Sequence, residues 1–178
     1  MRLADNVVSD DLIDATPGGG LGNAISVDNY TIANNAIGTD YVMQAQLGNG
    51  STFTLTNTII DQGGHPTIDY QGPSGALVTQ YLLSNDVSTL IQDGTIFGGV
   101  PTYVDAANGN YHLQPTSPGV DFAPAGTSST DLDGNPRVVD LSVIANRFGP
   151  MDLGAYEVQT ASACLASDTI FCNGFEGN

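Results

Sequence analysis

The chain has 178 residues, a length that suits one domain with a sizeable hydrophobic core. Its 19 acidic residues against three arginines give a net charge of −16, which disfavours nucleic acids and anionic membrane surfaces as partners. Glutamate occurs only at Glu157 and Glu176 and 22 residues are glycine, so residue types that favour helix surfaces are scarce. We therefore predict an all-β fold. Because no apolar run approaches the ~20 residues of a membrane span, we also predict no transmembrane segment.

A loose repeat runs through the first half of the chain. Each unit starts with an apolar residue, carries an amide or acid at its third position, and ends on an apolar and a small polar residue; the units cover 3–9, 27–33, 55–61 and 78–84. Their starts lie 24, 28 and 23 residues apart, a period typical of solenoids. Units of this length without helix formers favour two or three short strands per turn. We therefore predict a single-stranded parallel β-helix of three to four coils over residues 1–95.

Stacking of such coils predicts columns of like residues. Two columns are apolar and face inward; one holds Leu3, Val27, Leu55 and Val78, and the other holds Val8, Ile32, Ile60 and Leu83. A third, polar column lies between the two apolar ones, at the predicted bend between strands. Asparagine tolerates the positive φ of a bend, and stacked amides can hydrogen-bond to those above and below. We therefore predict a structural ladder of Asp5, Asn29, Asn57 and Gln80. The alternative is that such residues are simply common near turns.

Beyond residue 95 the repeat stops and turn signals become dense. Gly98-Gly99, Asn108-Gly109 and Asp133-Gly134 separate short segments such as 111–114 and 137–141, which we expect to be strands. We predict that residues 96–158 form a β-rich cap that folds over the last coil and covers its open edge. Residues 159–178 are predicted to be a linker and tail.

Three ordered blocks of the predicted cap resemble the choice-of-anchor Q domain family. They are the Tyr-x-Leu-x-x-x-Ser-Pro stretch from Tyr111 leading to Asp121, the Asp-x-Asp-Gly-x-x-Arg turn of 131–137, and the Asp-x-Gly-Ala-x-Glu sequence of 152–157. The resemblance covers about residues 100–158, with a departure at 119–123. It implies a secreted or cell-surface bacterial protein whose upstream region is a right-handed parallel β-helix of the pectin-lyase-like superfamily. Because Met1 falls inside a repeat unit, we expect the C-terminal fragment of a longer exported protein.

These blocks also supply the residues that we expect to hold the cap together. Arg137, one of three cations, is expected to pair with Asp121, Asp152 or Glu157. Asp131 and Asp133 stand at alternate positions, as at the start of a Ca²⁺ loop, but no glutamate closes such a loop. An Asp-Gly turn is therefore the favoured interpretation, and we predict no cofactor, with Ca²⁺ near these two acids as a weak alternative.

The tail carries two further signals. Residues 168–176 resemble an Ile-Phe-x-x-Gly-Phe-Glu ending found on exported proteins of some gammaproteobacteria, which implies recognition by sorting machinery. Cys164 and Cys172 are the only cysteines. We predict a disulfide between them, formed in an oxidising compartment, with free thiols as the alternative and metal binding disfavoured.

Two classes of function remain open. The favoured one is a monomeric, non-enzymatic surface or secreted protein that displays or adheres, with polysaccharide or cell-surface glycan as a candidate partner. The rival is the terminal part of a polysaccharide lyase or glycoside hydrolase whose catalytic coils lie upstream. A lyase needs a cationic base, and Arg2 is the only cation of the coil region. No catalytic residue is predicted, because the coil acids are more typical of solvated turns; they include Asp10, Asp11, Asp28 and Asp61.

Overall fold

The structure is a computed structural model and describes residues 1–15, 22–38, 41–91 and 93–161. Strands are the main regular secondary structure of these residues, and the one helical element among them is a short 3₁₀ turn, η1 (Ala106–Asn108). The predicted all-β class is confirmed. The strands are β1 (Arg2–Ala4), β2 (Ile13–Ala15), β3 (Ala24–Asp28), β4 (Thr31–Ala33), β5 (Met43–Gln46), β6 (Thr52–Asp61), β7 (Ile68–Gln71), β8 (Leu77–Ser84), β9 (Ile96–Gly98), β10 (Tyr103–Asp105) and β11 (Asn110–Leu113).

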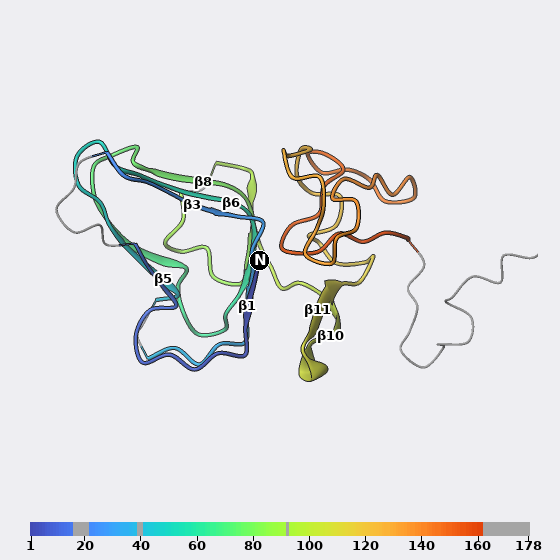
Figure 1. The fold of residues 1–178 in the computed structure, drawn as a ribbon, viewed down its shortest axis with the longest axis horizontal. Helices are drawn as coiled ribbons and strands as arrows, with labels where there is room; N and C mark the ends of the chain where they lie inside the picture. The colour runs from blue at the N-terminus through green and yellow to red at the C-terminus, as the bar shows by residue number, and fades with distance from the viewer. Residues whose placement is uncertain (16–21, 39–40, 92, 162–178) are drawn as a thin grey trace, which may run out of the picture.

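Two parallel sheets share the first half of the chain, which passes from one sheet to the other and back (Figure 1). The larger sheet has the order β1-β4-β6-β8-β9, with β3 also pairing with β6, and the smaller has the order β2-β5-β7. Every pair in them is parallel. We call each passage a winding; the four windings run through the described residues of 1–15, 22–46, 51–71 and 76–98.

A hydrophobic core fills the space between the two sheets. Phe53, Leu55 and Ile60 of β6 are fully buried in it, together with side chains from β5 and β7. Inward-facing residues of successive windings pair directly, Val27 with Leu55 and Ile32 with Ile60. These pairs confirm the predicted columns between the second and third windings, and their parallel direction.

The predicted register is wrong at the first winding. Leu3 pairs with Ile32 and not with Val27. The sequence Leu-Ala-Asp of 3–5 matches Ile-Ala-Asn of 32–34, so the repeat unit was aligned five residues too early. Val8 accordingly lies beyond the column of Ile32, where its N–H donates to the carbonyl of Ala36 at 2.9 Å.

The register is also wrong by one residue at the fourth winding. Leu55 pairs with Thr79 and not with Val78. A shift by one residue turns each side chain of a strand to the other face, so Thr79 is buried and Val78 is exposed. Threonine is β-branched like valine and fits the same pleated position, which explains why hydrophobicity alone placed the wrong residue inside.

In the second, third and fourth windings the larger sheet turns a corner at a residue with positive φ (Figure 1). Asn29, Asn57 and Tyr81 occupy this corner, with φ of 57°, 49° and 52°. The first two were predicted for the bend, whereas Gln80 lies one residue before it. We call this the first corner. Asp5 also has positive φ, 60°, but it lies beside Asn34, which has φ of 52° and marks a second corner further along the winding.

The hydrogen-bonded amide ladder lies in a column that sequence analysis missed. Asn35 Oδ1 accepts from Asn6 Nδ2 at 2.9 Å, and Gln62 Oε1 accepts from the backbone N–H of Asn35 at 2.9 Å. Asn85 Oδ1 in turn accepts from the backbone N–H of Gln62 at 3.2 Å. Asn35 and Gln62 are buried, so each amide satisfies the backbone of the winding beside it where no strand pairing does so.

The predicted ladder column is held differently. No hydrogen bond joins the side chains of Asn29 and Asn57 in the described structure. Asp28 connects the two windings instead, because its Oδ1 accepts from Asn57 Nδ2 at 2.8 Å and from Thr56 Oγ1 at 2.9 Å. Gln80 has an exposed side chain that points away from the core.

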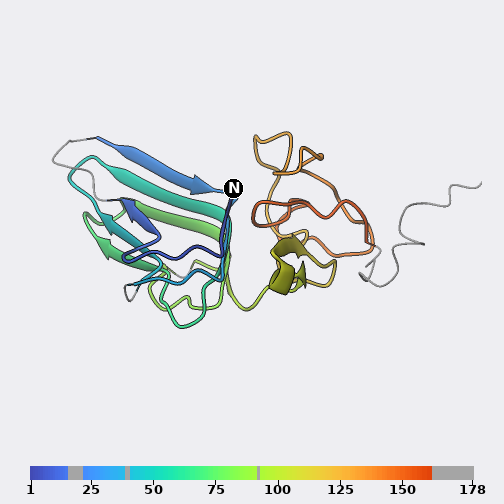
Figure 2. The ribbon, with the colours of Figure 1, turned by 60° about the horizontal axis from the view of Figure 1, so that its bottom comes forward.

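The segment after β9, which we call the cap, lies beside the windings and not over the last one (Figures 1 and 2). Its polar contacts reach the first, second and third windings: Tyr111 donates to Asp5 Oδ1 at 2.7 Å, Ala155 N–H to Thr31 Oγ1 at 2.9 Å, and Gly154 N–H to the carbonyl of Asn57 at 2.9 Å. The expectation that the cap covers the end of the stack is therefore wrong.

The cap docks on this side because of the part of each strand that follows the first corner, which we call the second limb. Successive residues of a strand face opposite ways, so Ile60 enters the core between the sheets while Ile59 faces outward. Ile59 and Leu83 form a second hydrophobic cluster with Phe122 and Leu153 of the cap. A limb that is apolar on both faces requires cover along its side, and the cap supplies it.

The cap contains less β structure than predicted. β10 and β11 form an antiparallel hairpin, but between Leu113 and Ala161 the chain has isolated bridges and no strand. The predicted strand at 137–141 is therefore not formed. Dense Gly, Pro and Asp residues favour turns there, and side-chain carboxylates replace strand pairing as hydrogen-bond partners.

The contact of Gly154 with the third winding allows a direct test of side-on docking. Gly154 has φ of 88°, and an added Cβ would lie 2.5 Å from Thr31 Oγ1 and 2.9 Å from Ile59 Cδ1. Gly134 has a similar φ of 85° but open space around it. Replacing either by alanine costs about 1–2 kcal/mol of backbone strain. We expect Gly154→Ala to lose roughly 1–3 kcal/mol more than Gly134→Ala, because it also clashes.

Urea denaturation of the two variants measures this difference. Equal losses in free energy of unfolding would show that Gly154 does not touch the windings.

Candidate functional site

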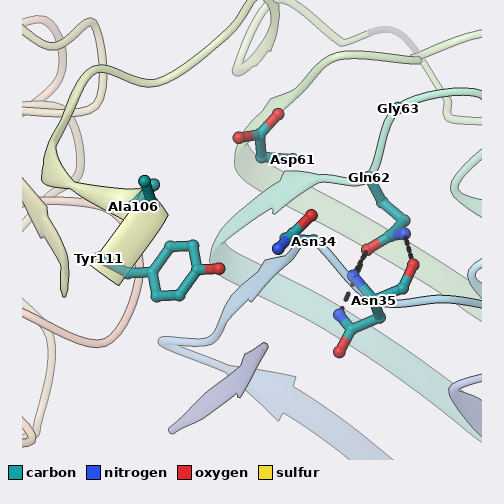
Figure 3. A pocket seen from close by; sticks show the side chains of 8 residues that line it. Asn34, Asn35, Asp61, Gln62, Gly63, Ala106 and Tyr111 are labelled. Atoms are coloured by element: carbon teal, nitrogen blue, oxygen red, sulfur yellow. Dashed lines mark hydrogen bonds between the residues drawn. The ribbon is translucent and has the colours of Figure 1, made fainter. Parts of the chain in front are cut away.

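A polar groove lies where the second and third windings meet the cap (Figure 3). It has a volume of about 510 Å³. The winding side contributes amide and carboxyl groups from the second corner, and the cap side contributes η1 and the start of β11. The lining residues are Asn34, Asn35, Asp61, Gln62, Gly63, Ala106, Ala107 and Tyr111.

One side of the groove is organised by a shared acceptor. Asp5 Oδ1 accepts from the Tyr111 hydroxyl at 2.7 Å and from Asn34 Nδ2 at 2.7 Å. Hydrogen bonds from Tyr111 and then Asn34 lower the pKa of Asp5, so this carboxylate stays ionised. The arrangement fixes the Asn34 amide with its Nδ2 occupied, which leaves its side-chain oxygen for a ligand.

Asp61 stands across from Asn34 in the groove (Figure 3). Its side chain is half-buried, and no described residue donates a hydrogen bond to its carboxyl group. Burial raises the pKa of Asp61. An acid that is partly desolvated and lacks an internal donor is suited to accept hydrogen bonds from a bound molecule.

One tyrosine of the cap, Tyr111, lines this groove, and a second, Tyr103, packs against it. The rings of Tyr103 and Tyr111 meet edge to face, with centroids 5.1 Å apart. The Tyr103 hydroxyl is buried and lacks a hydrogen-bond partner in the described structure, and burial raises its pKa far above its ordinary value. Arg2 lies over the Tyr111 ring at 5.5 Å from its centroid. Tyr111 itself is buried, so its face is not open to stacking.

A second group of predicted residues, the carboxylates of the cap, converges in its interior. Glu157 Oε1 accepts from the N–H of Val139 at 2.9 Å, and its Oε2 from that of Asp152 at 3.1 Å. Asp152 accepts from the N–H of Asp121 at 2.8 Å and from that of Val158 at 2.7 Å. These buried acids join separate loops by taking up backbone donors.

Arg137 joins the cap to the windings but forms no ion pair within 4.0 Å in the described structure. Its NH2 donates to Asn29 Oδ1 at 2.8 Å, to the carbonyl of Asp152 at 3.0 Å and to that of Gly154 at 2.5 Å. The expected pairing with the carboxylates of Asp121, Asp152 or Glu157 is therefore wrong, because backbone donors occupy Asp152 and Glu157. Burial lowers the pKa of Arg137, while the nearby charge of Glu157 opposes this shift.

The Asp-Gly turn uses its acids internally. Asp131 Oδ1 accepts from the N–H groups of Asp133 and Asn135, at 3.0 and 2.9 Å, and its Oδ2 accepts from that of Glu157 at 3.1 Å. Asp133 Oδ2 lies 2.6 Å from His112 Nε2. This is the turn geometry favoured from sequence, with both acids engaged.

The remaining predictions concern the tail, metal binding and membrane spans. Cys164, Cys172 and the sorting-type tail lie outside the described residues. Within the described ranges, no group of three or more His, Cys, Asp or Glu side chains is placed to hold a metal ion. No helix in the same ranges is long and apolar enough to cross a bilayer.

Comparisons with protein-family models, with curated proteins and with solved structures found no match.

The buried acids of the cap predict a stability that falls as pH rises. Burial raises the pKa of Asp152 from 3.8 to about 7 and that of Glu157 from 4.5 to about 8. Between these ordinary and raised values the folded chain binds protons that the unfolded chain has released. We therefore expect the free energy of unfolding to decrease from about pH 4 to about pH 8.

Urea titrations at several pH values test this expectation. Glu157→Gln and Asp152→Asn should each flatten the decrease. Asp14→Asn, which removes an exposed acid of β2 outside the cap, is the control and should retain the slope of the parent chain. An unaltered slope in Glu157→Gln would contradict the assignment.

Proposed function

We propose that this chain is part of an exported bacterial surface or secreted protein with a right-handed parallel β-helix, and that it binds a glycan in the polar groove. The parallel windings support the β-helix part of the proposal, and the three sequence blocks that resemble the choice-of-anchor Q domain family support the export part. The groove supports the binding part.

The observation that carries the proposal is the free hydrogen-bonding capacity at the groove. The Asp61 carboxyl and the Asn34 amide oxygen face the cavity, and neither has a donor among the described residues (Figure 3). Sugar hydroxyls are donors that such acceptors bind. The volume of about 510 Å³ accommodates a small ligand segment, and Ala106 and Ala107 add an apolar patch against which C–H groups can pack.

Binding without hydrolysis fits the groove better than the rival glycosidase function. Hydrolysis by either stereochemical route uses two carboxyl groups that flank the scissile bond. Of the described residues that line the groove, Asp61 is the only acid. Asp5, which contacts two of the lining residues, is engaged by Tyr111 and Asn34.

Titration of the purified chain with neutral oligosaccharides tests the proposal. We would use cellohexaose, maltohexaose and mannohexaose, followed by calorimetry. For the oligosaccharide that binds, we expect Asp61→Ala to weaken affinity about tenfold or more, since a hydrogen bond to a charged group contributes roughly 1.5–3 kcal/mol. Asp14→Ala is the matched control, because Asp14 is an exposed acid on β2 and its loss changes net charge equally.

Two results would contradict the proposal. One is an absence of binding to any oligosaccharide, or binding that Asp61→Ala leaves unchanged. The other is release of reducing sugar during incubation, which would favour the carbohydrate-active enzyme instead.

A further inference from the structure

A second cluster, separate from the groove, surrounds Arg147 at the junction of the cap and the fourth winding. The Arg147 guanidinium carbon lies 4.4 Å from the centroid of Phe97, 5.2 Å from that of Phe122 and 5.8 Å from that of Phe148. The side chain is exposed, although rings lie beneath it. Attraction to these rings holds the planar cation in place.

Arg147 has no partner for its charge among the residues that the structure describes. In the described structure no carboxylate lies within 4.0 Å of its guanidinium, and no acceptor takes a hydrogen bond from its side chain. Arg137 by contrast is buried and donates to three acceptors, and Arg2 donates to the carbonyl of Gly109. The chain has a net charge of −16, yet the N–H donors of the Arg147 guanidinium remain available to an external acceptor.

Backbone hydrogen bonds and ring contacts hold the aromatic residues of this cluster in place. The N–H of Arg147 donates to the carbonyl of Asp121 at 2.8 Å, and that of Phe148 donates to the carbonyl of Phe122 at 3.1 Å. Phe148 meets Phe122 and Tyr81 edge to face, at centroid distances of 5.5 and 5.6 Å. Phe148 is nevertheless 42 % exposed, so part of this ring remains open. A preorganised aromatic surface loses little entropy when it binds a ligand.

Tyr81 gives an independent reason to look for a function here. It has φ of 52°, at the corner that asparagine occupies in the second and third windings. A bulky side chain in this backbone region costs roughly 1–3 kcal/mol, and such strain is concentrated at functional sites. At this corner the tyrosine ring packs against Phe148 and extends the aromatic surface.

The chemistry of the cluster selects the class of ligand. A guanidinium fork matches a carboxylate, and an exposed aromatic ring suits the C–H face of a pyranose. The net charge of −16 repels chains that carry many negative charges, and the site offers a single cation. We infer that Arg147, Phe148 and Tyr81 form a binding site for a sugar acid carried by an otherwise uncharged glycan.

This site lies apart from the groove, so it can bind its ligand even if the groove binds none. Paired oligosaccharides that differ only in the acid group distinguish the two. We would titrate the full chain with 3′-sialyllactose against lactose, and with cellobiouronic acid against cellobiose. For at least one pair we expect the acidic member to bind about tenfold more tightly, as a charge-assisted bidentate contact allows.

Variants assign the preference to the cluster. Arg147→Gln should remove it, and Arg147→Lys should restore it in part, because lysine keeps the charge without the planar fork. Phe148→Ala should weaken binding of the acidic member. Arg2→Gln is the matched control, since Arg2 also lies over an aromatic ring, and it should leave the preference intact. Circular dichroism confirms that each variant is folded.

Three results would overturn the inference. They are equal affinity for the acidic and neutral members of both pairs, a preference that survives in Arg147→Gln, and tighter binding of the polyanion heparin than of either single acid. Loss of neutral oligosaccharide binding in Asp61→Ala concerns the groove alone and leaves this site unaffected.

Discussion

The corner at Asn29 and Asn57 is the constraint on which the rest of the molecule depends. A positive φ at each position turns the larger sheet within a single strand, and asparagine adopts this conformation at lower cost than most residues. The turn separates two limbs with different surroundings. The first limb has one buried face, whereas the second is buried on both, with Ile60 toward the windings and Ile59 toward the cap.

The cap attaches at the same corner. Gly154 donates to the carbonyl of Asn57, and Arg137 donates to the side chain of Asn29. The buried carboxylates of Asp152 and Glu157 then hold the loops that carry these two residues. Side-on docking also places η1 and β11 beside the second corner. The groove between the windings and the cap exists for that reason.

Sequence analysis predicted what short-range patterns determine. The scarcity of helix formers predicted the all-β class, and the shared spacing of Val27, Leu55, Ile32 and Ile60 predicted their pairing. It failed at the fourth winding because Thr79 fills an inward position in place of an apolar residue. The true amide ladder of Asn6, Asn35, Gln62 and Asn85 did carry a signal, an amide shortly after each strand limb. The predicted ladder instead stands at the corner of Asn29 and Asn57.

A repeat pattern cannot predict contacts between segments that are far apart in the sequence. Nothing local relates Thr31 to Ala155, or Phe97 to Arg147, since each pair forms only when the cap folds back along the windings. The sequence predicts Asp61 to be a solvated turn acid, because its setting in the groove depends on the same contact. Residues of the three cap blocks do contact one another, but the partners of Arg137 depend on which carboxylates the backbone has already occupied.

Side-on docking of the cap is the central claim, and methyl-detected NMR measures it most directly. Because Gly154 lies against Ile59 and the N–H of Ala155 bonds to Thr31, we predict nuclear Overhauser effects from the Ile59 δ1 methyl to Gly154 and from the Thr31 methyl to Ala155. A cap seated over the end of the stack would instead show cap contacts at Leu83 and Phe97 alone. The absence of both Ile59 and Thr31 effects, in a folded sample, would contradict the account.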